Sequence, residues 1–167
     1  TNHMLLNTNL FSPSLMGFFS YFPGMQCNHG VLSLNHDVNG HIELNDESYS
    51  LDAYLGYTEK DWGESFPKSW IWLQCNEKLE NWIPISFMWS IANIPYGVLK
   101  FTGLISVLMI GDKQYRFSTY NLSKIVSISK SKGKVLIVLI KGNLRLDISA
   151  SMTQKSILKA PTNEGMN

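Results

Sequence analysis

The hydrophobic and polar positions alternate with a period of two along much of the chain, which is typical of strands rather than helices. Residues 144–150 show this most clearly, because apolar residues alternate there with Arg145 and Asp147, and this predicts a strand with one buried face. Residues 135–140 are apolar throughout, which predicts a strand buried on both faces. Helical periodicity is weak everywhere, and the best short helical candidate lies at residues 122–125.

The same pattern, bounded by turn residues, predicts short strands along the whole chain. We expect them at residues 31–36, 41–44, 48–51, 54–60, 70–76, 85–91, 98–110, 114–120, 124–129, 134–140 and 144–150. Asn39-Gly40 is typical of a type I′ turn, so the first of these strands should pair with the second as a hairpin. Many short strands at this spacing predict an all-β fold, an antiparallel meander that closes into a barrel or a sandwich, since closure removes exposed sheet edges.

The chain of 167 residues fits one domain. We expect an irregular arm over residues 1–24, a β-barrel domain over 25–157 and a C-terminal loop over 158–167. The first four residues have the character of a cloning remnant, and the last ten read as a loop cut short, so we expect the chain to be a piece of something longer.

Composition narrows the function classes. Hydrophobic residues make up 44% of the chain, enough for a sizeable core, and the net charge of +1 gives no electrostatic reason to expect nucleic acid or an anionic membrane as a partner. Two cysteines, Cys27 and Cys75, do not make a disulfide framework and are expected as reduced thiols in a cytoplasmic protein. No apolar run is long enough to span a bilayer, and no signal peptide is evident.

Residues 56–76 carry the densest mixture of aromatic and ionisable groups. At a strand period of two, Tyr57, Glu59 and Asp61 project from one face of the first strand of this stretch. After the Phe-Pro turn, the residues expected to share one face are Trp70, Trp72, Gln74 and Asn76. Such a face could line a cavity for an apolar ligand with one polar end. The alternative is that these strands are simply half-buried and their charges solvated.

The carboxyl groups of this stretch suggest acid–base chemistry. Desolvation by neighbouring aromatic rings favours the neutral form of a carboxyl group, which could then donate a proton, and the rings could stabilise a carbocation. The alternative is that Asp61 caps the Trp62-Gly63 turn and Glu59 pairs with a lysine.

Other chemistries find less support. Cys27 and His29 would share a strand face, but the spacing of the remaining histidines, His36 and His41, does not complete a zinc site, so we expect no metal. Neither a glycine-rich nucleotide-binding motif nor a Gly-x-Ser-x-Gly motif is present in the sequence.

Several segments resemble the tocopherol cyclase family. The most specific is G-Y-T-E-K-D-W-G at residues 56–63, followed by S-F-P at 65–67 and W-I-W-L-Q-C-N at 70–76. Further similar segments are M-Q-C-N-H-G at 25–30, S-I-A-N-I-P at 90–95, Y-R-F-S-T-Y at 115–120 and L-K-A-P at 158–161. The resemblance covers roughly residues 16–166. The family's usual opening segment of the Phe-Glu-Gly-Trp-Tyr-Phe kind and its strands beyond the Ala-Pro loop have no counterpart here.

The resemblance implies a lipocalin-like β-barrel, or half of a larger barrel assembly, related to carotenoid 1,2-hydratases. It implies protonation of an isoprenoid alkene, as when a prenylated hydroquinone closes to a chromanol, with no redox cofactor. A Tyr-x-Asp element of the hydratases matches Tyr57 and Glu59, so Glu59 is the implied acid, with Tyr57 and His29 orienting it. The residues expected to bind substrate are Trp62, Trp70, Trp72, Gln74 and Asn76.

Two functions remain open at this point, an isoprenoid cyclase or hydratase and a lipocalin-like carrier without catalysis, beside the option of a folded fragment with no ligand of its own. Both need the same apolar pocket and a hydrophobic small molecule as partner. Peripheral contact with a membrane is an option for collecting such a lipid.

Overall fold

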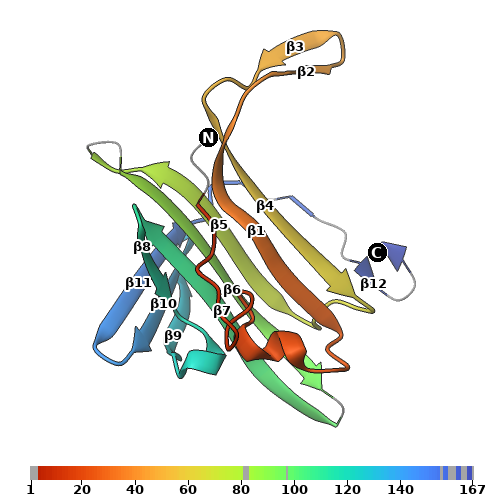
Figure 1. The fold of residues 1–167 in the computed structure, drawn as a ribbon, viewed down its shortest axis with the longest axis vertical. Helices are drawn as coiled ribbons and strands as arrows, with labels where there is room; N and C mark the ends of the chain where they lie inside the picture. Colours follow the sequence, from red (N-terminus) through yellow and green to blue (C-terminus); the bar gives the residue numbers. More distant parts are fainter. Residues whose placement is uncertain are drawn as a thin grey trace.

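The computed structural model describes residues 4–80, 83–96, 98–154, 156–157, 161–162 and 165–166, and its secondary structure is almost entirely β (Figure 1). The strands are β1 (Cys27–Val38), β2 (His41–Leu44), β3 (Glu47–Ser50), β4 (Tyr54–Gly63), β5 (Trp70–Lys78), β6 (Pro84–Tyr96), β7 (Leu99–Ile110), β8 (Lys113–Arg116), β9 (Lys124–Ser131), β10 (Lys134–Lys141), β11 (Leu144–Ser151), β12 (Pro161–Thr162) and β13 (Gly165–Met166). The described residues also include the 3₁₀ turns η1 (Gly17–Tyr21), which precedes β1, and η3 (Thr119–Asn121), which lies between β8 and β9. Every strand pair is antiparallel, so the predicted all-β class is confirmed.

The short helix predicted at residues 122–125 is wrong. The 3₁₀ turn η3 ends one residue earlier, Leu122 adopts a left-handed conformation with φ of 64°, and Lys124 already begins β9. The strand predicted at 114–120 is likewise shorter, since β8 ends at Arg116.

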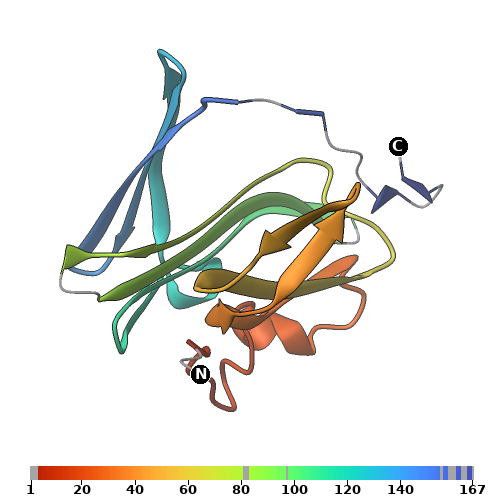
Figure 2. The same ribbon diagram turned by 90° about the horizontal axis from the view of Figure 1, so that it is seen from above.

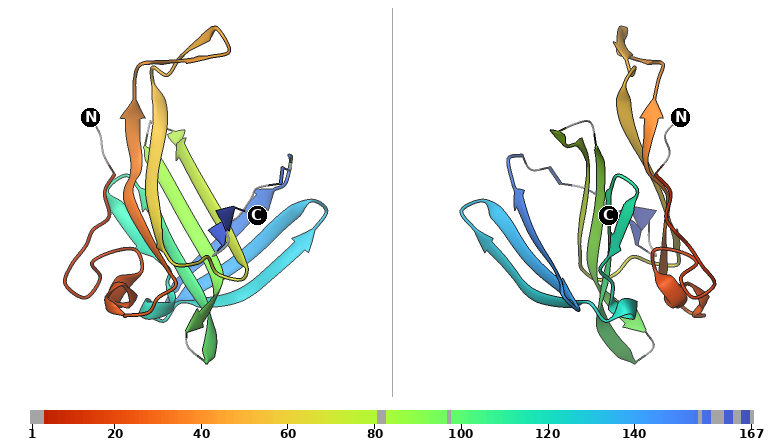
Figure 3. Two further views of the ribbon diagram at one scale, coloured as in Figure 1. Left: turned by 90° about the vertical axis from the view of Figure 1, so that its right-hand side faces the viewer. Right: turned by 60° about the vertical axis from the view of Figure 1, so that its left-hand side comes forward.

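The sheet β5-β6-β7-β8 forms the middle layer of the molecule. The pair of strands β1 and β4, together with the N-terminal arm, lies on one side of it, and the sheet β11-β10-β9 lies on the other (Figures 2 and 3). Both faces of the middle sheet are therefore covered over part of their area.

Two apolar clusters fill the spaces between the layers. Trp89 and Ile91 of β6 pack with Ile137 and Leu139 of β10 on one side. Met88, the neighbour of Trp89, points the other way and packs with residues that include Leu15, Leu34, Val107 and Met109. This alternation along β6 follows from the strand period and anchors both outer layers to one strand.

The prediction that residues 135–140 are buried on both faces is wrong. Ile137 and Leu139 are buried, but Leu136 between them is 41% exposed. The β9–β11 sheet packs on the middle sheet through one face, and no described element covers the other. In β11, Leu146 and Ile148 pack against the core while Arg145 and Asp147 are exposed, as predicted.

The predicted pairing of residues 31–36 with 41–44 is also wrong. β1 pairs with β4, and β2 pairs with β3, so the four strands form one long hairpin whose tip projects from the molecule (Figures 1 and 3). The tight turn lies at Asn45 and Asp46, which both have positive φ, of 51° and 64°. At Asn39-Gly40 only the glycine has positive φ, so this dipeptide connects β1 to β2 without reversing the chain.

The strands of the described residues do not close into one barrel. No backbone ladder joins β4 to β5 or β8 to β9 there, and the strands divide into separate packed sheets. A side chain bridges the gap between β4 and β5, because Asn76 Nδ2 donates to the carbonyl oxygen of Gly56 at 3.4 Å. Parts of the predicted arm and C-terminal loop, residues 1–3, 158–160, 163–164 and 167, lie outside the described residues. The described part of the chain contains no helix long and apolar enough to cross a membrane.

Truncation of Leu139 should destabilise the fold far more than truncation of Leu136 on the same strand. Leu139 is fully buried, so Leu139→Ala should lower the free energy of unfolding by about 2–5 kcal/mol, because it removes transfer energy and leaves a cavity. Leu136→Ala is the matched control and should cost less than about 1 kcal/mol. Urea unfolding measures both, and equal losses would contradict the packing of β10 through one face.

Candidate active site

The pairing of β1 with β4 sets the position of three ionisable side chains. His29 lies directly opposite Asp61 in the antiparallel ladder, and Val31 lies opposite Glu59. Residues two apart on a strand share a face, so His29, Asp61 and Glu59 all project toward the middle sheet. The prediction that Glu59 and Asp61 share a strand face is thereby confirmed.

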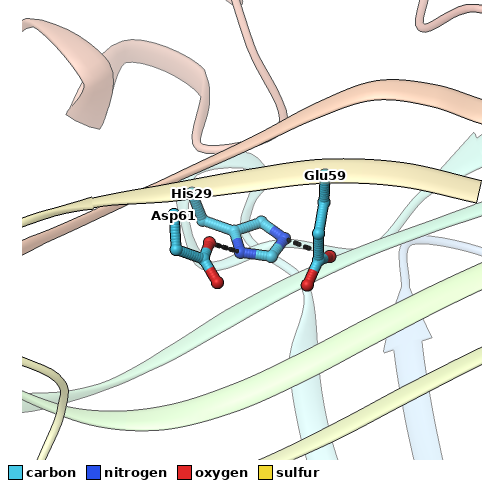
Figure 4. Close-up of side chains that lie close together, drawn as sticks. All are labelled: His29, Glu59 and Asp61. Carbon is cyan, nitrogen blue, oxygen red and sulfur yellow. Dashed lines mark ion pairs between the residues drawn. The ribbon is translucent and has the colours of Figure 1, made fainter. Parts of the chain in front are cut away.

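The imidazole of His29 lies between the two carboxylates (Figure 4). Its Nδ1 contacts Oδ1 of Asp61, and its Nε2 lies 3.4 Å from Oε2 of Glu59. His29 is well shielded, with only 13% of its side chain exposed, and each carboxylate side chain is 24% exposed. We refer to His29, Glu59 and Asp61 as the carboxylate–imidazole array.

Further donors converge on Glu59. The hydroxyl of Tyr57 donates to Oε2 at 2.5 Å, and the indole Nε1 of Trp72 donates to the same oxygen at 3.3 Å. Within the described residues Oε1 receives no hydrogen bond, which leaves this oxygen available to a ligand. The rings of Tyr57 and Trp72 lie 6.2 Å apart and are tilted against each other.

A cavity of about 260 Å³ adjoins this array. Its walls come from β1, β4, β5, β6, β7, the N-terminal arm and the turn before β5, and they are mainly apolar. The lining residues are Met16, Gln26, Cys27, His29, Glu59, Asp61, Phe66, Pro67, Trp70, Trp72, Ser90, Ala92, Ile94, Pro95, Gly103 and Ile105. An apolar hollow with a few polar groups at one end suits a largely apolar molecule with a polar end.

Of the residues predicted to bind substrate, Trp70 and Trp72 line the cavity, and Phe66 packs near Trp70 with ring centroids 5.6 Å apart. Trp62, Gln74 and Asn76 do not line it. Trp62 lies on the opposite face of β4, where its ring covers Gly30 of β1 and where the ammonium group of Lys60 lies 5.8 Å from its centroid.

Asn76 has a structural position instead of a ligand-binding one. It donates to Gly56 across the gap between β4 and β5, and its Oδ1 lies 2.7 Å from the hydroxyl of Ser86. Gln74 shares the face of Trp72 but lies beyond the cavity lining.

The alternatives considered for the carboxylates do not hold. Asp61 contacts His29 rather than capping the Trp62-Gly63 turn, and Glu59 contacts His29 and Tyr57 rather than a lysine. The sequence placed Asp61 on the face of Glu59, but it did not predict the contact between Asp61 and His29.

Burial and the nearby carboxylates raise the pKa values of two neighbouring acids, Tyr57 and Cys27. Desolvation, together with the hydrogen bond to Glu59, raises the pKa of Tyr57, so its phenol stays protonated and remains a donor at neutral pH. Burial and the charge of Asp61 raise the pKa of the Cys27 thiol to about 11, so Cys27 is a neutral wall of the cavity rather than a nucleophile.

The array is also the place in the described residues where three side chains could approach one metal ion, since their ligand atoms lie within 4.8 Å of one another. One ring nitrogen of His29 and one oxygen from each carboxylate would give such an ion three protein ligands, the number that catalytic zinc sites use. Each ring nitrogen of His29 faces a different carboxylate, an arrangement that also suits a proton relay.

Comparisons with known proteins identify the family of the chain. A sequence model of a family described as tocopherol cyclase-like matches residues 7–167. The chain belongs to the tocopherol cyclase-like family. Two curated relatives are the chloroplastic tocopherol cyclase of Zea mays and the probable chloroplastic tocopherol cyclase of Oryza sativa subsp. japonica.

Each relative is 32% identical over 63 residues, which is 38% of this chain and 13% of the relative's length. The matched region is therefore a small part of either plant protein. No solved structure matches the chain significantly. The plant names specify the chloroplast for those two proteins, and the cytoplasmic location expected for this chain stays a prediction.

This tocopherol cyclase-like chain also places residues at the cavity that the sequence did not single out. Met16 comes from the N-terminal arm, and its sulfur lies 3.1 Å from the backbone nitrogen of His29. Gly103 and Ala92 face each other across β7 and β6 and line the cavity with little side-chain volume. No local signal marks these residues, because they reach the site only through long-range pairing.

Cys27 should react slowly with a thiol-alkylating reagent at neutral pH. In a Cys75→Ser variant, which leaves one thiol, the alkylation rate should rise with pH with a midpoint of about 11, because only the thiolate reacts. Adding Asp61→Asn should move the midpoint down, since it removes a neighbouring negative charge. A midpoint at that of a free cysteine, unmoved by Asp61→Asn, would contradict the burial of Cys27 beside the array.

Proposed function

We propose that this protein acts on a prenylated hydroquinone or another isoprenoid by protonating an alkene, without a redox cofactor. The observation that supports this most is the position of Glu59, whose carboxyl group lines an apolar cavity while Tyr57 and Trp72 donate hydrogen bonds to it and His29 lies beside it. Membership of the tocopherol cyclase-like family agrees with this class of reaction.

The proposed reaction is balanced in protons and electrons. The carboxylic acid of Glu59 gives its proton to one alkene carbon, and the π electrons form the new C–H bond, which leaves a tertiary cation. The phenolic oxygen of the substrate then bonds to the cation and loses its own proton, which returns to the carboxylate of Glu59. No oxidant or reductant is required, so the acid is restored at the end of each turnover.

The other residues have distinct proposed roles. Asp61 accepts a hydrogen bond from Nδ1 of His29 and orients the ring, so that Nε2 faces Glu59 and can exchange a proton with it. Tyr57 fixes the carboxyl group through Oε2, which leaves Oε1 toward the cavity. The faces of Trp70 and Trp72 can stabilise the cation electrostatically.

The alternative is a carrier that binds the same class of ligand and performs no chemistry. The predominance of apolar walls around the cavity favours it, because ligand burial alone would account for them. Binding of an apolar ligand with quenching of tryptophan fluorescence, and no product detected by mass spectrometry, would identify a carrier.

Glu59→Gln should abolish most turnover of a prenylated hydroquinone by the full chain while leaving ligand binding intact. The amide keeps the shape of the carboxyl group but cannot donate the proton, and loss of a general acid lowers kcat by about 10²–10⁴-fold. Glu77→Gln, on an exposed position of β5, is the matched control and should leave kcat unchanged. Product formation followed by mass spectrometry measures both, and an undiminished rate in Glu59→Gln would refute the role of Glu59.

Asp61→Asn should lower kcat by about 10- to 100-fold with little change in KM, because one hydrogen bond to a charged group is lost and His29 is no longer oriented. Asp61→Glu should restore part of the loss, since it returns the carboxylate. A change in KM alone, or equal kcat values for Asp61→Asn and Asp61→Glu, would indicate that Asp61 only shapes the cavity.

A further inference from the structure

A second pocket, of about 340 Å³, lies between the N-terminal arm, β8, η3 and the end of β10. It shares no lining residue with the apolar cavity and has a different character. Its lining includes two cations, Arg116 and Lys141, and no acidic side chain. Arg116 belongs to the segment at residues 115–120, to which the proposed function gives no role.

The two cations have no carboxylate partner in the described residues. The ion pairs found there involve His29 with Glu59 and Asp61, and Arg145 with Asp147. The guanidinium of Arg116 instead donates to neutral oxygens, those of Ser12, Tyr120 and the backbone of the arm. Lys141 Nζ donates to the backbone carbonyl oxygen of Arg116 at 3.3 Å, and both side chains line the pocket.

The amide side chains of the pocket also present donors. Oε1 of Gln114 accepts from the backbone nitrogen of Asn7 at 3.0 Å. Oδ1 of Asn9 accepts from the backbone nitrogen of Ser12 at 2.9 Å, and Oδ1 of Asn121 accepts from that of Ser118 at 3.0 Å. Nδ2 of Asn121 already donates to the carbonyl oxygen of Arg116 at 3.0 Å, so the N–H₂ groups of Gln114 and Asn9, whose oxygens are engaged by N–H groups, are the ones left for a ligand.

The Nε atom of Arg116 adds a further unused donor. It is buried and has no hydrogen-bond partner among the described residues. A buried donor without a partner is costly in free energy. An anion beside the guanidinium would compensate the positive charge of that group.

We propose that this pocket binds a phosphate-like anion, either free in solution or as the headgroup of a lipid. Two uncompensated cations and amide groups whose free atoms are donors match the acceptor oxygens of a phosphate. The proposal does not depend on the reaction assigned to the apolar cavity, because the two sites share no residue.

The test uses calorimetric titration of the full chain with inorganic phosphate, compared with chloride at equal ionic strength. Lys141→Gln, which keeps a donor but removes the charge, should weaken phosphate binding about tenfold. Lys134→Gln, at the exposed opposite end of the same strand, is the matched control and should bind as the wild type does. Arg116 stays intact because its guanidinium holds the arm.

Vesicles distinguish the source of the phosphate. Binding to phosphatidylcholine vesicles only when phosphatidic acid is added, competed by inorganic phosphate and weakened by Lys141→Gln, would identify a lipid headgroup. Binding of inorganic phosphate without vesicle binding would identify a free anion. Absence of phosphate binding in the wild type, or equal weakening by Lys141→Gln and Lys134→Gln, would overturn the proposal, and equal melting temperatures in chloride would establish that the variants fold.

Discussion

The register between β1 and β4 is the constraint on which the site depends. It places His29 opposite Asp61 and diagonal to Glu59, and a slip of β1 by one residue would turn His29 to the face away from the two carboxylates. The hairpin is fixed at its end by the backbone, since Glu64 N and Ser65 N both donate to the carbonyl oxygen of Gln26. A Cβ atom on Gly63 would lie 2.1 Å from that oxygen, so glycine is required where the two strands close.

The cavity exists because β6 and β7 are filled unequally on their two faces. Trp89 and Ile91 fill the face toward β10, whereas Ser90 and Ala92 on the other face leave room below β1 and β4. Gly103 of β7 lies opposite Ala92 and enlarges that room. The same strands therefore supply a close-packed core on one side and a ligand-sized hollow on the other.

The strand period was enough to predict the local part of this structure. It correctly placed Glu59 with Tyr57 and Asp61, and Trp70 with Trp72. Applied consistently it would also have placed Trp62 with Lys60 on the outer face, where the structure has it, instead of in the binding site.

The parts of the fold and of the site that the strand period did not predict depend on contacts between segments that are distant in the sequence. Asp61 finds His29 only through a ladder interrupted by irregularities after Val31, and no local pattern predicts such shifts. Asn39-Gly40 is the stronger hairpin signal in the sequence, yet the chain reverses at Asn45-Asp46, where both residues have positive φ. Gly40 lies within the long hairpin and connects β1 to β2. The contribution of Met16 depends on how the arm folds back over β1.

The most direct test of the account is the protonation of the His29 ring, measured by nitrogen-15 NMR of the histidine side chains. His29→Asn would assign its signal among those of the four histidines. The account predicts a proton on Nδ1, shifted to low field by the hydrogen bond to Asp61, and a loss of that shift in Asp61→Ala. A ring protonated on Nε2 alone, with an Nδ1 signal unaffected by Asp61→Ala, would contradict the carboxylate–imidazole array.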